Sequence, residues 1–329
     1  ANGLSFRRDC YYLAKLPPRP MMYSSFVRWS QVSLVLLASQ VATAAMAAAP
    51  KDTLLHSHLP QTSIDEPFPT NEVLIAQVIP DDTLGSESSL VVGDGITDLI
   101  EGGAARGENL FHSFEEFNVN TGQQVYFANP IGIENILRRV TGANLSDIDG
   151  VLGVNGAANL FLLNPNGIRF GPNAMLDLSG SFTASTADTV DFEDGGVFSA
   201  VNPEGGQFLT MSVPLGVQFG QQPQGDISNS GDLAVEAGES LTLFGNSVVS
   251  DGALTAAGGT VAILGNQVSL VDQATVDVSG DGGGGTVLIG GDYQGQGVVP
   301  TAGETVVEAG VEIAADALGV GDGGTVLVG

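Results

Sequence analysis

LTLFGNSV at residues 241–248 recurs as VAILGNQV at residues 261–268, and this repeat decides the fold of the chain. The tetrapeptide GGTV repeats in the same region, beginning at Gly258, Gly284 and Gly323. Imperfect repeats of about twenty residues are typical of solenoids, in which each repeat stacks on its neighbours. The C-terminal half is therefore predicted to be a solenoid.

The residues around these repeats indicate that the solenoid is all-β. A strand-and-helix repeat needs stretches rich in Leu, Glu and Lys, and none follows Arg169. In an all-β coil, inward Val, Leu and Ile stack between turns, while Gly and Asn occupy the corners. The only segment with a helical pattern is 133–140, where we expect a short helix. Because the chain stops at Gly329, directly after a repeat, we expect the natural protein to continue.

The net charge limits the kinds of partner that this chain can bind, and the cysteine content limits the disulfides that it can form. The formal net charge is −27, which argues against nucleic acid as a partner because phosphate binding needs Lys and Arg. No Lys, Arg or His follows Arg169, so the acidic half is either a solvated surface or a cation-binding one. Cys10 is the single cysteine. A protein threaded through a pore avoids disulfides, and a protein with an adequate core does not need them.

The first 77 residues are predicted to precede the folded domain. Residues 1–20 read as upstream read-through, and 21–49 read as a signal peptide with Arg28 before an apolar stretch and small residues at its end. A buried helix or a membrane anchor is the alternative. Residues 50–77 contain four prolines and are predicted to be a linker. We expect cleavage within 44–49 or, alternatively, after Ala76.

Several long stretches then match a known family in order: GGAARGENLFHSFEEFNV (102–119), VYFANPIGIENILRRVTG (125–142), SDIDGVLGVNGAANLFLLNPNGIRFGPNA (146–174), LDLSGSFTAST (176–186) and LTMSVPLGVQFG (209–220). They resemble the haemagglutination-activity, or two-partner-secretion, domain of filamentous haemagglutinin-type exoproteins, in the version common in cyanobacteria. The resemblance places this domain at 78–220. Residues 221–329 are predicted to continue the β-helix repeats.

The resemblance implies a fold and a route. The fold is an all-β, right-handed parallel β-helix with a small capping sheet at its N-terminal end. The route begins with the general secretory machinery, which delivers the chain to the periplasm. A partner outer-membrane β-barrel transporter with periplasmic binding domains then exports it to the cell surface. Distal parts would act in adhesion on an unknown surface receptor.

The segment Asn164-Pro165-Asn166-Gly167-Ile168 corresponds to one of the family's two Asn-Pro-Asn motifs. Asn at the first position, Pro at the second and Gly at the fourth fit a type I turn. The motif is therefore either a structural corner or a contact with the export barrel.

The family's second Asn-Pro-Asn motif has no intact counterpart. Its nearest match is Asn129-Pro130.

A cap region is predicted at Asn109, Leu110, Phe111 and His112. One histidine beside two glutamates, without cysteine, is a weak metal signal, so we interpret His112 as packing in the cap. The Gly-rich segment 279–285 lacks a phosphate-binding pattern, and 319–328 only partly resembles a calcium-binding repeat. We expect no metal and no cofactor.

Two other function classes stay open. A β-helix polysaccharide-cleaving enzyme would need a base or paired carboxylates, and Asp191, Glu193 and Asp194 are the tight acidic group of the first half. They read as a solvated turn, so we expect a non-enzymatic protein. The second class is a carrier of a toxin or protease domain beyond this sequence.

Overall fold

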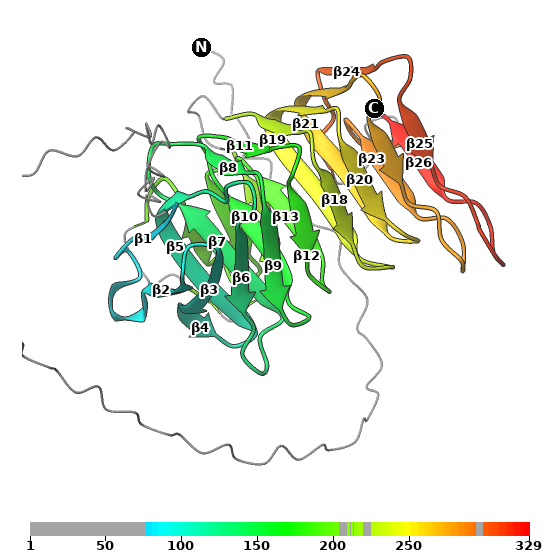
Figure 1. The fold of residues 1–329 in the computed structure, drawn as a ribbon. Helices are drawn as coiled ribbons and strands as arrows, with labels where there is room; N and C mark the ends of the chain where they lie inside the picture. Colours follow the sequence, from blue (N-terminus) through cyan, green and yellow to red (C-terminus); the bar gives the residue numbers. More distant parts are fainter. Residues whose placement is uncertain (1–76, 204–208, 211, 213, 220–224, 294–298) are drawn as a thin grey trace, which may run out of the picture. The chain divides into compact units, whose positions relative to one another are not determined.

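The computed structural model describes residues 77–203, 209–210, 212, 214–219, 225–293 and 299–329 (Figure 1). The predicted read-through, the signal peptide and all of the linker except Gln77 lie outside these residues. The described chain is all-β, with one short 3-10 helix, η1 (Gly85–Glu87). It holds no helix long and apolar enough to span a membrane.

The strands form a parallel coil with three faces. The first face contains β5 (Asn109–Phe117), β7 (Asn135–Val140), β10 (Asn159–Leu163), β13 (Phe182–Ser185), β19 (Ser240–Ser250), β21 (Thr260–Leu270), β23 (Thr286–Ile289) and β26 (Thr325–Val328). The second face contains β8 (Ser146–Ile148), β11 (Ile168–Phe170), β17 (Ile227–Asn229), the ends of β19 and β21, and β24 (Glu304–Val307).

The third face contains β3 (Thr97–Gly102), β6 (Gln124–Ala128), β9 (Val151–Asn155), β12 (Met175–Asp177), β18 (Asp232–Val235), β20 (Ala253–Ala256), β22 (Thr275–Asp277) and β25 (Glu312–Ala314). Successive strands of each face lie side by side from the N-terminal to the C-terminal end (Figure 1). The predicted right-handed parallel β-helix is confirmed, and right-handed crossovers are the general rule for parallel strands. We call one turn a rung: rung 1 is 109–128, rung 2 is 135–155 and rung 3 is 159–177.

The strand register explains the sequence repeats. Leu241 pairs with Val261 and Val248 pairs with Val268, so the two eight-residue copies lie directly beside each other. Val261 also pairs with Val287 on the next strand of the first face. The predicted solenoid is thus correct, and the unequal spacing of the repeats reflects unequal loops between matching strands.

Antiparallel strands close the N-terminal end. β1 (Val78–Pro80) and β4 (Ala104–Arg106) both pair antiparallel with β5, and β2 (Ser89–Gly93) pairs antiparallel with β3. These short strands cover the open backbone and core of rung 1. They are the capping structure that the resemblance implies.

The helix expected at 133–140 is wrong, because this segment forms strand β7. β7 pairs in parallel with β5 on one side and β10 on the other. Ile136 points into the lumen of the coil, while Leu137 belongs to a second core on the outer side of the first face. Two ladders of hydrogen bonds and burial on both sides outweigh the local helix preference of the segment.

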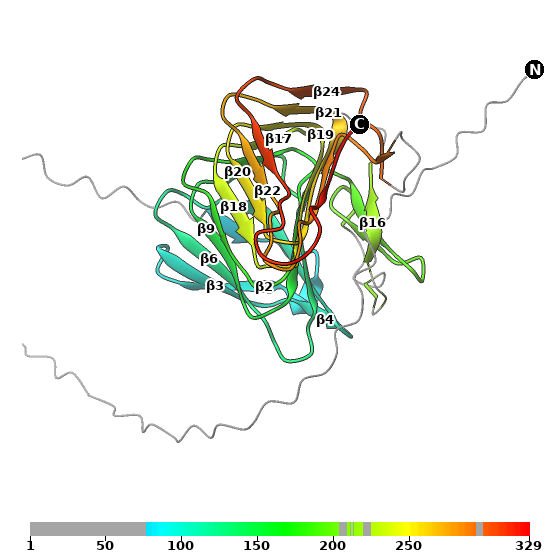
Figure 2. The same cartoon turned by 90° about the vertical axis from the view of Figure 1, so that its right-hand side faces the viewer.

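An additional sheet interrupts rung 4, the turn that begins with β13 and ends with β18. β14 (Thr189–Phe192), β15 (Val197–Ser199) and β16 (Pro214–Gln218) form a three-stranded antiparallel sheet between β13 and β17. In Figure 2, β16 lies beside the coil, on the side away from β6 and β9. This outer sheet covers the second core.

Candidate functional site

The Asn-Pro-Asn-Gly-Ile segment is the corner between β10 and β11. The Gly167 N–H donates to the Asn164 carbonyl oxygen at 3.2 Å, which closes a four-residue turn. The Asn166 N–H also donates to Asn164 Oδ1 at 3.0 Å. Gly167 has a φ of 125°, a conformation that strains residues with a Cβ. The local sequence therefore suffices to form this turn.

The corner is also hydrogen-bonded to rung 2. Asn164 is fully buried, and its Nδ2 donates to the Asn144 carbonyl oxygen at 3.1 Å and to Ser146 Oγ at 3.0 Å. Asn166 Nδ2 donates to the Gly142 carbonyl oxygen at 2.8 Å. Asn164 is thus a buried connection between rungs as well as a turn residue.

The five corner residues differ in what a partner can reach. Asn164, Gly167 and Ile168 are buried, and Ile168 lies in the lumen core. Pro165 is half-buried and Asn166 is exposed. A partner protein can therefore touch this corner only through Pro165 and Asn166.

Asn129 and Pro130 form a different corner, between β6 and β7. The Ile133 N–H donates to the Pro130 carbonyl oxygen at 3.1 Å, and Asn129 Nδ2 donates to the Ile133 carbonyl oxygen at 3.0 Å. This turn joins the third face to the first, whereas Asn164 joins the first face to the second. The structure does not bring the two motifs together.

The predicted cap region lies on β5 in rung 1. Leu110 belongs to the lumen core and Phe111 to the second core. Asn109 Nδ2 donates to the Thr210 and Ser212 carbonyl oxygens at 3.1 and 2.7 Å, which connects rung 1 to the segment before β16.

Asn109 also begins a ladder of amide side chains. Asn135 Nδ2 donates to Asn109 Oδ1 at 3.1 Å, and Asn159 Nδ2 donates to Asn135 Oδ1 at 3.0 Å. Each asparagine from rungs 2 and 3 therefore donates to the rung before it.

His112 is fully buried in the lumen. Its Nδ1 lies 3.0 Å from Ser89 Oγ, and its ring packs edge-on to Phe127. Burial and the nearby Arg138 charge lower the pKa of His112 to about 3, so the imidazole is neutral near pH 7. Glu115 is exposed, so the sequence neighbours of His112 do not share its site. Among the described residues, no group of three His, Cys, Asp or Glu could hold a metal ion.

Two adjacent arginines on β7 were not identified from the sequence. Arg139 is buried under the outer sheet and donates to Ser113 Oγ at 2.9 Å, to the Ser199 carbonyl oxygen at 2.6 Å and to Thr83 Oγ1 at 2.9 Å. Burial lowers its pKa to about 10, against the opposing effect of the Asp81 charge.

Arg138 points the other way, into the lumen, and is fully buried. Its guanidinium carbon lies 3.3 Å from the centroid of the Phe117 ring. None of its three nitrogens has a hydrogen-bond partner. The doublet Arg-Arg within an apolar run was the available signal, since neighbouring strand residues face opposite sides.

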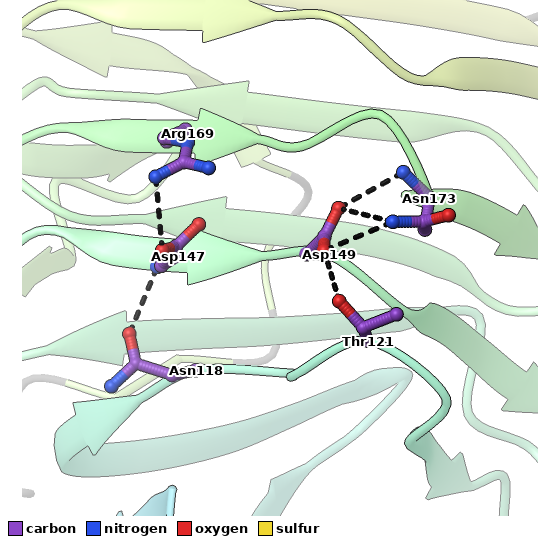
Figure 3. Close-up of polar contacts among 6 residues, drawn as sticks. All are labelled: Asn118, Thr121, Asp147, Asp149, Arg169 and Asn173. Atoms are coloured by element: carbon purple, nitrogen blue, oxygen red, sulfur yellow. Dashed lines mark hydrogen bonds and ion pairs between the residues drawn. The ribbon is translucent and has the colours of Figure 1, made fainter.

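A polar ladder also connects rungs 1 to 3 on the outside of the coil. Figure 3 shows its members: Asn118, Thr121, Asp147, Asp149, Arg169 and Asn173. Asp149 accepts hydrogen bonds from Thr121 Oγ1 and from the Asn173 backbone and side chain. The Thr121 bond and then the Asn173 backbone bond lower the pKa of Asp149. Arg169 pairs with Asp147 at 3.3 Å.

The acidic group at 191–194 lies in the hairpin between β14 and β15. Asp194 is exposed and accepts hydrogen bonds from Thr210 Oγ1 and, at 2.9 Å, from the Gly196 N–H. The Thr210 bond is the largest cause of a lowered pKa at Asp194. Asp191 accepts a bond from Thr189 Oγ1 at 2.9 Å. These carboxylates organise a surface turn.

The fold and its corner define a class, the capped right-handed parallel β-helix whose first rungs are fastened by asparagine side chains. The family described as TPS secretion domain matches residues 76–319, more than half of the chain. The chain belongs to this family, and the resemblance seen in its sequence is confirmed. The matched range crosses residue 220, and the boundary placed there remains a prediction.

One curated protein and two solved structures are similar to parts of this chain. A heme/hemopexin-binding protein of Haemophilus influenzae is 28% identical over 144 residues, which are 44% of this chain and 14% of that protein. The chain thus spans a small part of that relative's length. The HMW1 secretion domain of Haemophilus influenzae is 20% identical with a TM-score of 0.38, over 70% of this chain and 82% of that domain. The filamentous hemagglutinin secretion domain is 14% identical with a TM-score of 0.37, over 77% and 99%.

Proposed function

We propose that this chain is the export-directing part of a secreted, non-enzymatic exoprotein. After delivery by the general secretory machinery, its first rungs engage a partner outer-membrane β-barrel transporter with periplasmic binding domains. They then seed β-helix folding outside the cell. Distal parts of the protein act in adhesion at the cell surface. Membership in the TPS secretion domain family supports export.

One observation carries the seeding role: three asparagine side chains of rungs 2 and 3 donate hydrogen bonds to the preceding rung. Asn135 donates to Asn109, Asn159 donates to Asn135, and Asn164 donates to Ser146. In a chain that emerges with its N-terminus first, each donor meets an acceptor that is already in place. This direction supports growth of the coil from rung 1.

The Asn-Pro-Asn-Gly-Ile corner has two roles in this proposal. Asn164 and Gly167 fasten rung 3 and act through folding. Pro165 and Asn166 are accessible and contact the export barrel. Loss of Asn166 should therefore reduce export much more than it reduces stability.

The test compares two exposed asparagines of rung 3. Asn166→Ala removes the side-chain bonds to the Gly142 carbonyl oxygen and to Asn164 Oδ1 at the corner, and Asn173→Ala removes bonds to Asp149 on the outer ladder. For each variant, the unfolding midpoint of the purified chain and the fraction exported with the co-expressed barrel are measured. We expect near-native midpoints in both and reduced export in Asn166→Ala only. Equal, normal export of both variants would reject the contact.

The competing function is cleavage of polysaccharides. The hairpin around Asp191 and Asp194 supports the non-enzymatic proposal, because Asp194 is exposed to water, whereas a general acid is desolvated, and Asp191 is held in the turn by Thr189. Incubation with bacterial and plant polysaccharides should release no sugar. Release that disappears in Asp191→Ala would establish the enzyme instead.

A further inference from the structure

One column of residues runs through the lumen along the first face of the coil. The strand register aligns its members in the order His112, Arg138, Leu162, Ala184, Leu243, Ile263, Ile289 and Val328. Rungs 1 and 2 contribute ionisable side chains, and every later rung contributes an aliphatic one. Aliphatic residues therefore suffice to fill this position.

Arg138 is the costly member of this column. Its guanidinium is fully buried, without a hydrogen-bond partner, and no acidic group lies against it in the column. An arginine does not lose its charge as a buried lysine does. The contact with the Phe117 ring offsets only part of the lost hydration. Burial of Arg138 therefore opposes folding.

The unfavourable burial of Arg138 occurs at one step of coil growth, the docking of rung 3 on rung 2. Arg138 pairs with His112 of rung 1 and with Leu162 of rung 3. While rungs 1 and 2 are the only folded turns, Arg138 lies at the open end of the lumen. A long arginine side chain can there extend its charged group into water. Docking of rung 3 places Leu162 over it and removes that water.

The same step forms the corner's bonds to rung 2. Asn164 begins to donate to Asn144 and Ser146, and Asn166 begins to donate to Gly142. Asn164 follows Leu162 by two residues, so the bonds and the burial of Arg138 occur together. Docking of rung 3 thus combines an unfavourable burial with favourable hydrogen bonds.

We propose that Arg138 slows folding at the docking of rung 3, so that the coil stays open until the Asn164 corner has formed. A protein that must cross a pore unfolded benefits from such a delay. This export consequence rests on the proposed function, whereas the effect on folding does not.

The folding test uses neighbouring arginines in the purified full chain. Arg138→Met removes the buried charge and keeps an unbranched side chain. Arg138→Leu introduces the residue found at this position of the column on β10 (Leu162) and on β19 (Leu243). Arg139→Met is the matched control, because Arg139 has hydrogen-bond partners. Refolding from urea is followed by circular dichroism.

We expect Arg138→Met to raise the unfolding midpoint and to speed refolding about tenfold, which corresponds to about 1.4 kcal/mol of barrier. Arg139→Met should lower the midpoint. A lowered midpoint or slower refolding in Arg138→Met would overturn the proposal. Failure of both Arg138 variants to fold would also overturn it, because the side chain would then be required for packing.

Two further measurements test whether Arg138 acts at the docking of rung 3 and whether this affects export. Asn164→Ala should refold more slowly, and the added Arg138→Met should restore a rate close to that of the unchanged chain. In cells with the partner barrel, Arg138→Met should be exported less. Faster refolding with unchanged export would reject the export consequence alone. Reduced export with unchanged refolding would reject the folding effect and leave the proposed function standing.

Discussion

The first three rungs and the rungs from β19 onward, which we call the last rungs, belong to the same coil but are held together differently. Rungs 1 to 3 bury His112, Arg138, Arg139 and Asn164, and amide ladders connect them. The rungs from β19 onward contain no basic residue, and their lumen column is aliphatic. Stacked apolar residues suffice to continue a coil whose register already exists. Starting a coil requires contacts that fix the register, and buried groups with hydrogen-bond partners, such as Arg139 and Asn164, do so because few other partners satisfy them.

The largest expected effect concerns Arg139. Arg139→Met should lower the free energy of unfolding by about 3–4 kcal/mol, because it leaves buried acceptors such as the Ser199 carbonyl oxygen without a donor. Urea denaturation measures it. Ile263→Val in the last rungs should cost only about 1 kcal/mol. Equal losses of unfolding free energy in the two variants would contradict the distinction between the first three rungs and the last rungs.

The next effect is a pH dependence that only the first rungs can produce. The folded pKa of His112, about 3, is below its ordinary value of 6.5, so between these values the unfolded chain binds a proton that the folded chain does not. Stability should therefore fall as pH falls from 6.5 toward 4.5, by about 1.4 kcal/mol per pH unit.

The matched variant for this prediction is His112→Leu. Whatever its effect on stability at pH 7, it should flatten the pH dependence between 6.5 and 4.5. Denaturation curves at several pH values decide the matter. An unchanged slope would show that His112 is not the group that titrates.

A smaller difference is expected between the stability losses caused by replacing two corner asparagines, Asn164 and Asn246. Asn164→Ala should cost about 2–3 kcal/mol, because Asn164 is buried and its loss leaves Ser146 Oγ without its donor. Asn246 occupies the corresponding corner in the last rungs, where it is exposed and donates to Asp226 Oδ1 at 3.0 Å. Asn246→Ala should cost less than about 0.5 kcal/mol. Similar midpoints for both variants would contradict the comparison.

The smallest expected effect comes from salt. Because no basic residue follows Arg169, the last rungs contain no basic side chain of their own, and their carboxylates repel one another. Sodium chloride at about 0.15 M screens this repulsion and should raise the unfolding midpoint slightly. A midpoint that falls as salt rises would contradict the argument. A large response to micromolar calcium, absent with magnesium, would point to cation binding instead.

The amino-acid sequence by itself determined the features that near neighbours control. The repeat of LTLFGNSV as VAILGNQV predicts the solenoid and aligns Leu241 with Val261, as the strands do. The turn at Asn164 was also predictable, since proline and glycine restrict the backbone locally. Leu241 and Val261 lie on adjacent rungs only twenty residues apart, so their contact leaves a repeat that can be read in the sequence.

Only the tertiary structure decided the contacts between residues that the sequence repeat does not relate. The outer sheet interrupts rung 4 and brings Ser199 to Arg139, 60 residues away in sequence. The segment 133–140 has a helical pattern but becomes a strand because β5 and β10 flank it. The sequence showed two arginines there, but the register alone turns Arg138 into the lumen and Arg139 outward. A shift of one residue would exchange them, since side chains alternate along a strand.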